Sequence, residues 1–288
     1  MSVNPLVQPF YDPVSSTVSY VVHAGAGSAC AVIDPVLDFD PRAGRTSRLQ
    51  AERILDFIAA HSLVLAWILE THVHADHLTA ACVLKSRAGG RVAIGAGVVA
   101  VQRVFGELFN VAPGFPSDGS QFDHLFIDDE TFAIGDLASR VLATPGHTPD
   151  GVTYLVGDAA FVGDTMFMPD GGTARCDFPG GDARLLYRSL RRILDLPTAT
   201  RLFVCHDYQP GGRPLAWETS VAEQRATNIH VRDGIDETAF VALRNERDAK
   251  LPPPALLLPA VQVNMRAGAV PPPEANGVSY LKIPIDRW

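Results

Sequence analysis

The sequence predicts an α/β protein that is built from two mixed β-sheets with helices on their outer faces. Apolar runs typical of strands occur both in consecutive series and singly between helical segments. That mixture favours two sheets with helices outside over one doubly wound sheet. The 288 residues are 47% hydrophobic and 19% charged, which is a globular composition with enough length for one large core. We expect a single domain over residues 1–288, with an extended, Pro-rich C-terminal tail from about residue 251.

The first half of the chain is predicted to begin with two strands, Thr17–His23 and Ser28–Ile33, joined by a hairpin turn at Ala24–Gly27. A helix is expected from Ser47 to Ala60, because apolar residues recur there at helical spacing and Ser47 with Gln50 fits a capping box. The other elements expected in this half are strands at Leu63–Leu69 and Val92–Ile94 and helices at Leu78–Arg87 and Val98–Phe109.

The second half is predicted to contain a series of short strands and three helices. Asp182 is the expected cap of the first helix, a second starts near Trp217, and a third covers roughly Asp236–Arg247. Proline fixes φ and lacks an amide N–H, so the Pro-rich tail is expected to be irregular rather than helical. The expected strands are His124–Ile127, Thr131–Ile134, Ser139–Ala143, Val152–Val156, Ala160–Val162 and Arg201–Cys205.

Charge and targeting features exclude several classes of function. A formal net charge of −8 argues against nucleic acid or an anionic membrane as the main partner. The sequence shows no signal peptide and no run near the roughly 18 apolar residues of a membrane span. The cysteines are widely spaced and form no C-x-x-C pair. Cys30, Cys82 and Cys176 are expected to be buried, inert thiols. A reduced, cytoplasmic protein is therefore expected.

The densest chemical signal is the segment Thr71-His-Val-His-Ala-Asp-His77, which follows the apolar run Leu63–Leu69. Neutral imidazole and carboxylate oxygen are both common metal ligands. Polar groups that crowded are costly to bury unless something satisfies them, and a divalent cation does so. Ligands at the carboxyl end of a strand also lie where α/β folds place their sites.

Three further His or Asp residues occupy the same position just past a predicted strand. They are His147 in Thr144-Pro-Gly-His147, Asp164 in Gly163-Asp164, and His206 in His206-Asp207. A single such residue means little, but four strand ends that share the pattern indicate a common site. His23, His61, His124 and His230 lack this context and are expected to be structural or solvated.

These residues, His72-x-His74-x-Asp76-His77 followed by His147, Asp164 and His206, resemble the ligand set of the metallo-β-lactamase fold superfamily. The resemblance implies an αβ/βα sandwich of two mixed sheets flanked by helices, with metal at one edge. The segments Ala174-Arg-Cys-Asp-Phe178, Cys205-His-Asp-Tyr208 and Val263-Asn-Met-Arg266 are similar to the persulfide dioxygenase branch. That branch oxidises glutathione persulfide with O₂ to sulfite and glutathione.

The resemblance also implies roles for individual residues. His72, His147 and Asp164 would hold one Fe(II) per chain, the two-His, one-carboxylate arrangement of non-haem iron oxygenases. The surrounding groups would orient ligands or hold a second metal; they are His74, Asp76, His77 and His206. Asp76 and His77 are also the candidates for catalytic roles. Arg175 would hold a glutathione carboxylate, which suits a planar guanidinium, and Tyr208 would line the same pocket.

Other functions remain open on the sequence alone. A glyoxalase II-like thioesterase, which cleaves acylated glutathione, could use the seven ligands to hold two zinc or mixed metals, with Asp164 as the bridge. A non-catalytic sulfur-binding module is disfavoured by the intact ligand set. A secreted β-lactamase is disfavoured by the missing signal peptide. The sequence leaves the oligomeric state open and is compatible with a homodimer.

Overall fold

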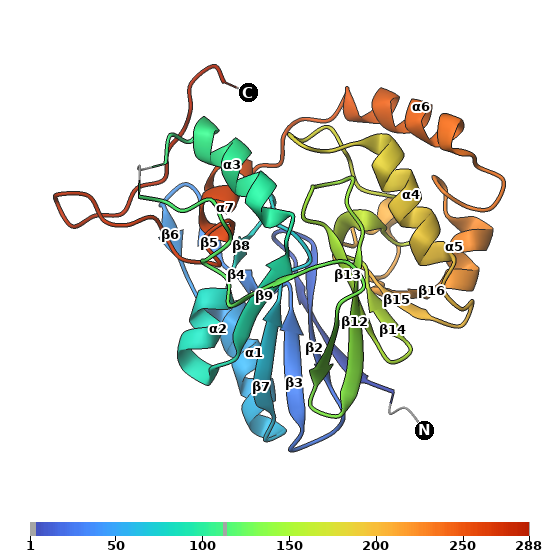
Figure 1. The fold of residues 1–288 in the computed structure, drawn as a ribbon, viewed down its shortest axis with the longest axis horizontal. Coiled ribbons are helices and arrows are strands. Elements are labelled where there is room, and N and C mark those ends of the chain that lie inside the picture. The colour runs from blue at the N-terminus through green and yellow to red at the C-terminus, as the bar shows by residue number, and fades with distance from the viewer. Residues whose placement is uncertain (1–3, 112–113, 288) are drawn as a thin grey trace.

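The computed structural model describes residues 4–111 and 114–287 and has the expected four layers. Two six-stranded mixed sheets face each other, and helices cover the outer face of each sheet (Figure 1). The fold class predicted from the sequence is therefore confirmed. None of the helices in these described ranges has the length and apolar character needed to span a membrane.

The first sheet has the strand order β1-β2-β3-β7-β9-β10. The pairs β1–β2 and β2–β3 are antiparallel, and the pairs from β3 through β7 and β9 to β10 are parallel. The predicted hairpin between β2 and β3 is thus present. The strand bounds are β1 Leu6–Asp12, β2 Thr17–His23, β3 Ala29–Ile33, β7 Val64–Leu69, β9 Arg91–Gly95 and β10 His124–Phe126.

The second sheet has the order β11-β12-β13-β14-β15-β16. Only β14 and β15 pair in parallel; every other neighbouring pair is antiparallel. The strand bounds are β11 Thr131–Ile134, β12 Leu137–Ala143, β13 Val152–Val156, β14 Ala159–Phe161, β15 Arg201–Phe203 and β16 Glu218–Ser220. Two short pairs lie outside the sheets: β4 Val36–Leu37 with β8 Leu78–Thr79, and β5 Phe39–Asp40 with β6 Arg45–Thr46.

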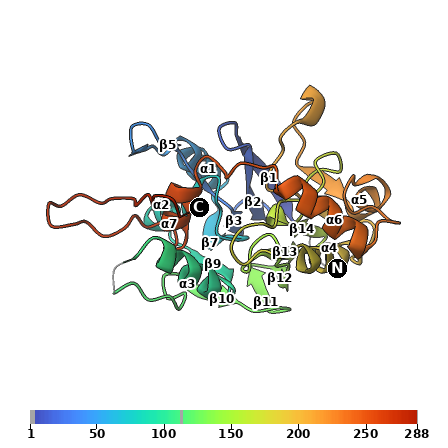
Figure 2. The ribbon, with the colours of Figure 1, turned by 90° about the horizontal axis from the view of Figure 1, so that it is seen from above.

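Each outer face is covered by helices with an apolar side (Figure 2). On α4, for example, Leu186, Leu190 and Ile193 are fully buried at helical spacing, and Asp182 caps the helix through a 2.9 Å bond from Leu185 N, as predicted. The first sheet is covered by α1 Leu49–Ala60, α2 Ala81–Ala88, α3 Val98–Leu108 and α7 Leu257–Asn264, and the second by α4 Ala183–Leu194, α5 Val221–Thr227 and α6 Glu237–Asp248.

The core between the sheets is rich in aromatic rings. Tyr20 packs edge-on against Phe161 and Phe203, and its hydroxyl donates to the Val204 carbonyl at 2.5 Å. Trp67 is buried, as predicted, and donates its indole N–H to Ala133 O at 2.9 Å. Because the Tyr20 hydroxyl and the Trp67 indole N–H both have hydrogen-bond partners, these large rings can be buried without an unsatisfied donor.

Three predicted elements differ from the structure. The capping box at Ser47 is absent: α1 starts at Leu49, and the carboxylate of Asp38 accepts from Gln50 N at 3.1 Å in its place. The helix expected from Leu78 starts only at Ala81, because residues 78–79 pair with β4. The helix expected near Trp217 is preceded by strand β16, and α5 starts at Val221.

The Pro-rich tail also differs from expectation, since it contains helix α7. Pro259 falls in the first turn of this helix, where the backbone N–H has no intrahelical partner, so the ring is tolerated. Asn264 at the end of α7 donates its amide to His74 O at 2.9 Å and His77 O at 2.8 Å, and accepts from Thr79 N at 2.8 Å. The tail therefore clamps the segment that carries the His cluster.

Asn264→Ala should lower the free energy of unfolding by about 1–3 kcal/mol, because it leaves two buried carbonyls and one N–H without partners. Urea denaturation of the variant and of Asn245→Ala measures this effect. Asn245 lies on the exposed face of α6, so its replacement should leave stability unchanged or slightly raised. Equal stability of the two variants would contradict a clamping role for Asn264.

Candidate metal centre

Four loops bring the predicted strand-end residues together at one edge of the sandwich. The His72–His77 segment lies between β7 and β8, and His147 follows β12. Asp164 lies in η1, a 3₁₀ turn at Gly163–Thr165 that follows β14, and His206 follows β15. The four segments come from both sheets, so the site lies where the two sheets meet.

Two glycines allow these loops to approach one another. Gly163 has φ +51°, and a Cβ there would lie 2.6 Å from Thr71 Oγ1, so only glycine lets η1 come this close to the His72 segment. Gly146 has φ +134°, and a Cβ there would lie 2.3 Å from the Leu186 backbone. The loop that carries His147 therefore rests directly on α4.

The first cluster consists of His72, His147 and Asp164. Their potential ligand atoms all lie within 4.8 Å of one another. Asp164 Oδ2 is 3.9 Å from His72 Nε2 and 3.6 Å from His147 Nε2. Two imidazole nitrogens and one carboxylate oxygen thus point at a common space, which is the donor set of a facial two-His, one-carboxylate site.

His72, His74 and His147 are each oriented by a hydrogen bond from the ring nitrogen that faces away from the site. His147 Nδ1 donates to the Arg175 carbonyl at 2.5 Å, and His74 Nε2 donates to the Asp34 carboxylate at 2.9 Å. Thr71 Oγ1 donates to Asp34, so it accepts from His72 Nδ1 at 3.0 Å. Each ring therefore keeps a lone pair on the nitrogen that faces the site, as metal-binding histidines do.

A second cluster lies beside the first and consists of His74, Asp76 and His77, whose ligand atoms also lie within 4.8 Å of one another. Asp76 Oδ2 is 3.2 Å from His77 Nδ1 and 3.4 Å from His206 Nε2. His206 Nε2 is in turn 3.3 Å from Asp164 Oδ1, which joins the two clusters.

Unpartnered polar atoms show that these residues fit a metal ion. Among the buried side-chain atoms of the described residues, those that lack a hydrogen-bond partner include Nε2 of His72, His77 and His206, Nδ1 of His74 and Oδ1 of Asp164. Buried polar groups in native proteins rarely lack partners. Five such atoms gathered at one place fit the binding of one or more divalent cations, which would satisfy those that act as ligands.

Burial and neighbouring charges set the protonation of the site. Burial lowers the pKa of His72 and of His74 well below the usual histidine value, with neighbouring imidazoles adding to the effect. Burial also raises the pKa of Asp164, although His206 and His147 oppose it. Burial acts against ionisation of Asp76 too, but His206 and His77 outweigh it and hold the pKa of Asp76 well below its ordinary value. The imidazoles of His72 and His74 are thus neutral and available as ligands.

Residues that the sequence analysis did not select support the ligands. Asp34 accepts from Thr71 N at 2.7 Å as well as from His74, and Asp150 Oδ2 accepts from Val73 N at 2.7 Å. Thr17 Oγ1 lies within 3.4 Å of Asp76 Oδ2 and of the Nδ1 atoms of His77 and His206. Asp34 directly follows strand β3, so the strand-end pattern could have found it; Thr17 and Asp150 carry no comparable signal.

The two proposed substrate residues each contact a histidine of this centre, Arg175 through its carbonyl to His147 and Tyr208 through its ring to His206. The Arg175 guanidinium forms a bidentate pair with Asp177, at 2.6 and 2.7 Å, and donates to the carbonyl of Pro252 at 2.6 Å. Tyr208 is largely exposed and its ring stacks on His206, with 5.6 Å between centroids. Asp207 accepts from Gln209 N at 3.2 Å, so it caps a turn.

The cysteines are all free thiols, and three are buried. Burial raises the pKa of both Cys30 and Cys176 to about 12, which makes them inert thiols as expected. Cys82 is exposed on α2, contrary to the expectation that it is buried, because it lies on the outward side of that helix.

Comparison with known proteins gives consistent matches. A model of the metallo-beta-lactamase superfamily matches residues 12–206. A probable metallo-hydrolase of Burkholderia pseudomallei is 55% identical over 97% of this chain and 99% of its own length. The beta-lactamase hydrolase-like protein of Agrobacterium fabrum is 52% identical, and the chain spans 65% of its length. Glyoxylase B2 of Dictyostelium discoideum is 47% identical over 99% of both chains.

Persulfide dioxygenases also match over most of the chain. The human mitochondrial persulfide dioxygenase ETHE1 is 30% identical over 93% of this chain and 90% of its own length. The crystal structure of ETHE1 from Myxococcus xanthus is 31% identical, with a TM-score of 0.73 over 92% of this chain and all of that one. The family model, these relatives and the geometry of the site agree, and the chain belongs to the metallo-β-lactamase superfamily.

Proposed function

We propose that this chain is a persulfide dioxygenase that oxidises glutathione persulfide with O₂ to sulfite and glutathione. The observation that carries the proposal is the convergence of two imidazole nitrogens and one carboxylate oxygen, from His72, His147 and Asp164, on one space. The similarity to ETHE1 proteins from human and Myxococcus xanthus, at 30% and 31% identity, supports the same branch of the family.

In this proposal His72, His147 and Asp164 hold one Fe(II) per chain. When bound, iron supplies the one-electron chemistry that lets O₂ react with sulfur, which side chains cannot supply. The protein holds the ligands in place from outside. Asp34 and Thr71 orient His74 and His72, and the Arg175 carbonyl orients His147.

The overall reaction consumes one water and releases two protons as persulfide and O₂ become thiol and sulfite. His77 and Asp76 are the groups that we propose to handle these protons. With His77 Nδ1 donating to Asp76 Oδ2 at 3.2 Å, the lone pair on Nε2 can accept a proton. Asp76 stays ionised because its pKa is held well below normal, so it stabilises the positive ring that results.

Arg175 and Tyr208 are the residues that we propose to contact the glutathione part of the substrate. Arg175 offers a guanidinium on the loop that hydrogen-bonds His147, and Tyr208 offers an exposed ring stacked on His206. Asp177 occupies the fork of Arg175, so a substrate carboxylate has to share or displace that partner. This competition makes the role testable.

The alternative function is a glyoxalase II-like thioesterase with two metal ions. A specific observation favours it: His74, Asp76 and His77 form a second ligand group beside the first, and Asp164 Oδ1 lies 3.3 Å from His206 Nε2. Glyoxylase B2, at 47% identity, supports this reading. Here His77 Nε2 would bind metal rather than accept a proton, and two ions would hold a hydroxide for hydrolysis.

Metal content and oxygen consumption separate the two functions. Protein purified without added metal should hold about one iron per chain and, with glutathione persulfide, should consume O₂ and form sulfite in equal amounts. His147→Ala and Asp164→Ala should both lose the iron. Two zinc ions per chain, together with hydrolysis of an acylated glutathione and no oxygen uptake after iron loading, would favour the thioesterase.

Iron retention should fall at acid pH, because protons compete with iron for Asp164. Binding needs ionised Asp164 and neutral imidazoles. The pKa of Asp164 is raised, so protons compete for it at a pH above the ordinary 3.8. The pKa values of His72 and His74 are lowered, so these rings stay neutral below 6.5. Dialysis across pH followed by metal analysis should show iron retained at neutral pH and lost on acidification. Iron retention that does not change as the pH falls would contradict a role for the Asp164 carboxylate as a ligand.

Substitutions at the Arg175–Asp177 pair should shift KM in opposite directions. Arg175→Ala should raise KM for the glutathione-linked substrate with a smaller effect on kcat, because it removes a binding contact. Asp177→Asn should lower KM, because it frees the guanidinium for the substrate carboxylate. Steady-state kinetics with glutathione persulfide and with a persulfide that lacks glutathione measures both. Equal effects on the two substrates would assign Arg175 a purely structural role.

A further inference from the structure

The loop that carries Arg175, which we define as residues 173–177, joins the metal centre to the helices behind it. On the side of the site, the Arg175 carbonyl accepts from His147 Nδ1 at 2.5 Å. The ring of Phe178, just after the loop, packs edge-on against His147 with 5.5 Å between centroids. The loop belongs to neither a helix nor a strand, so its backbone groups need partners elsewhere in the chain. Whatever supplies those partners sets the position of both Arg175 and His147.

Helix α6 supplies two of these partners, one on each side of Arg175. Arg244 Nη1 donates to the Thr173 carbonyl at 2.8 Å, and Asp248 Oδ2 accepts from Cys176 N at 2.9 Å. Both helix residues lie outside residues 12–206, the part of the chain that the superfamily model matches, so membership of the family gives them no role. The loop is therefore held from behind by two side chains that are one helical turn apart.

Arg244 and Asp248 also form an ion pair with each other, and both are almost fully buried, at 2% and 4% exposure. Arg244 Nε and Nη2 donate to Asp248 Oδ1 at 3.0 and 2.6 Å, which leaves Nη1 of the arginine and Oδ2 of the aspartate for the loop. The planar guanidinium can serve both partners because it carries donors on two edges. Replacing a buried ion pair with apolar side chains of similar size is often neutral or stabilising. Stability alone therefore does not account for the pair, whereas its contacts with the loop do.

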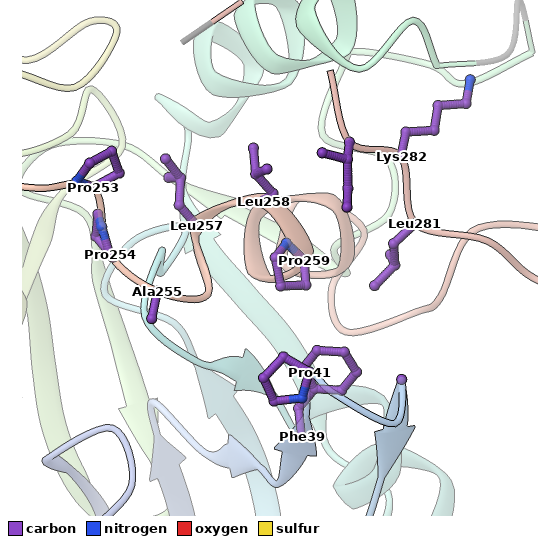
Figure 3. Close-up of a pocket in the computed structure, with 12 residues that line it drawn as sticks. Phe39, Pro41, Pro253, Pro254, Ala255, Leu257, Leu258, Pro259, Leu281 and Lys282 are labelled. Carbon is purple, nitrogen blue, oxygen red and sulfur yellow. The ribbon is translucent and has the colours of Figure 1, made fainter. Parts of the chain in front are cut away.

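The segment that follows α6 holds the side chain of Arg175 as well. Arg175 Nη1 donates to the Pro252 carbonyl at 2.6 Å, and Nη2 donates to the Leu251 carbonyl at 3.3 Å. Pro253 and Pro254 continue this segment toward α7 (Figure 3). Each proline ring fixes φ, so the segment has few alternative conformations. The end of α6 and the segment after it thus fix both the backbone of the loop and its guanidinium.

We propose that the buried Arg244–Asp248 pair positions the Arg175 loop, and through it both the metal ligand His147 and the guanidinium that contacts glutathione. The two residues act through the loop rather than on the metal or the substrate. Groups that orient a metal ligand in this way commonly change metal affinity by 10- to 100-fold. The glutathione contact rests on the proposed function, whereas the link to His147 requires only that this site binds metal.

Cobalt(II) titration of the metal-free chain tests the link to His147, because it requires no turnover. The double substitution Arg244→Met and Asp248→Leu removes the contacts with the loop without leaving a lone buried charge. It should raise the cobalt Kd at least about 10-fold, because His147 is no longer held in place. Arg244→Lys keeps the charge but loses the two-edged guanidinium, so it should weaken cobalt binding in the same direction. Circular dichroism and urea denaturation establish that the variants are folded.

The matched control is a neighbouring ion pair with the same spacing. Lys250 Nζ lies 2.8 Å from Glu246 Oε1, and the two side chains are 71% and 74% exposed. Glu246→Leu combined with Lys250→Met therefore removes an ion pair from the same region without touching the loop, and it should leave the cobalt Kd unchanged. Wild-type cobalt affinity in the folded Arg244 variants, or an equal loss of affinity in this control, would overturn the proposal.

Steady-state kinetics of the iron-loaded protein tests the contact with glutathione. The Arg244→Met, Asp248→Leu variant should raise KM several-fold for glutathione persulfide and leave KM unchanged for a persulfide that lacks glutathione. An equal rise for both substrates would refute the part of the proposal that concerns glutathione. A wild-type chain that takes up no O₂ with glutathione persulfide would refute the proposed function instead, and the cobalt titration would still decide the positioning role.

Discussion

The buried carboxylate of Asp34 is the interaction on which the site depends most. It accepts hydrogen bonds from Thr71 N, Thr71 Oγ1 and His74 Nε2, and lies 3.7 Å from Cys205 Sγ. These donors follow two strands, β7 and β15, and Asp34 itself follows β3, so a single side chain links three strand ends from two sheets. A carboxylate this deeply buried is tolerable only because its oxygens are so fully hydrogen-bonded. The orientation of His72 and His74 follows from that requirement.

The same residues are compatible with oxygenation at one metal and hydrolysis at two. His77 is the residue on which the difference turns. Its Nδ1 contacts Asp76 in either case, and its Nε2 has no hydrogen-bond partner among the described residues. The two proposed functions therefore differ in whether a proton or a cation is expected at that lone pair.

The sequence predicted the architecture, and it pointed to His and Asp residues that the structure brings together, because both follow from short-range patterns. Strand-end His and Asp residues were visible as departures from apolar runs, and the structure places all of them at one edge. Other features depend on contacts that spacing does not encode. Thr17 Oγ1 contacts His206 Nδ1 although the two residues are 189 positions apart in the sequence. Asn264 donates a hydrogen bond to the carbonyl of His74, which is 190 positions away. Helix α7 was missed because its one proline, Pro259, lies in its first turn, where proline does not break a helix. Ser47 was displaced as a cap by Asp38 from a neighbouring loop.

These long-range contacts have a consequence for synthesis of the chain. Thr17 forms a bridge with His206, and Val18 N donates to Cys205 O at 2.7 Å, so the start of β2 contacts a segment that is synthesised almost two hundred residues later. Asn264 extends that delay further. Contacts between such distant segments form slowly. The side chains of the site therefore come together only after translation has passed α7, which carries Asn264.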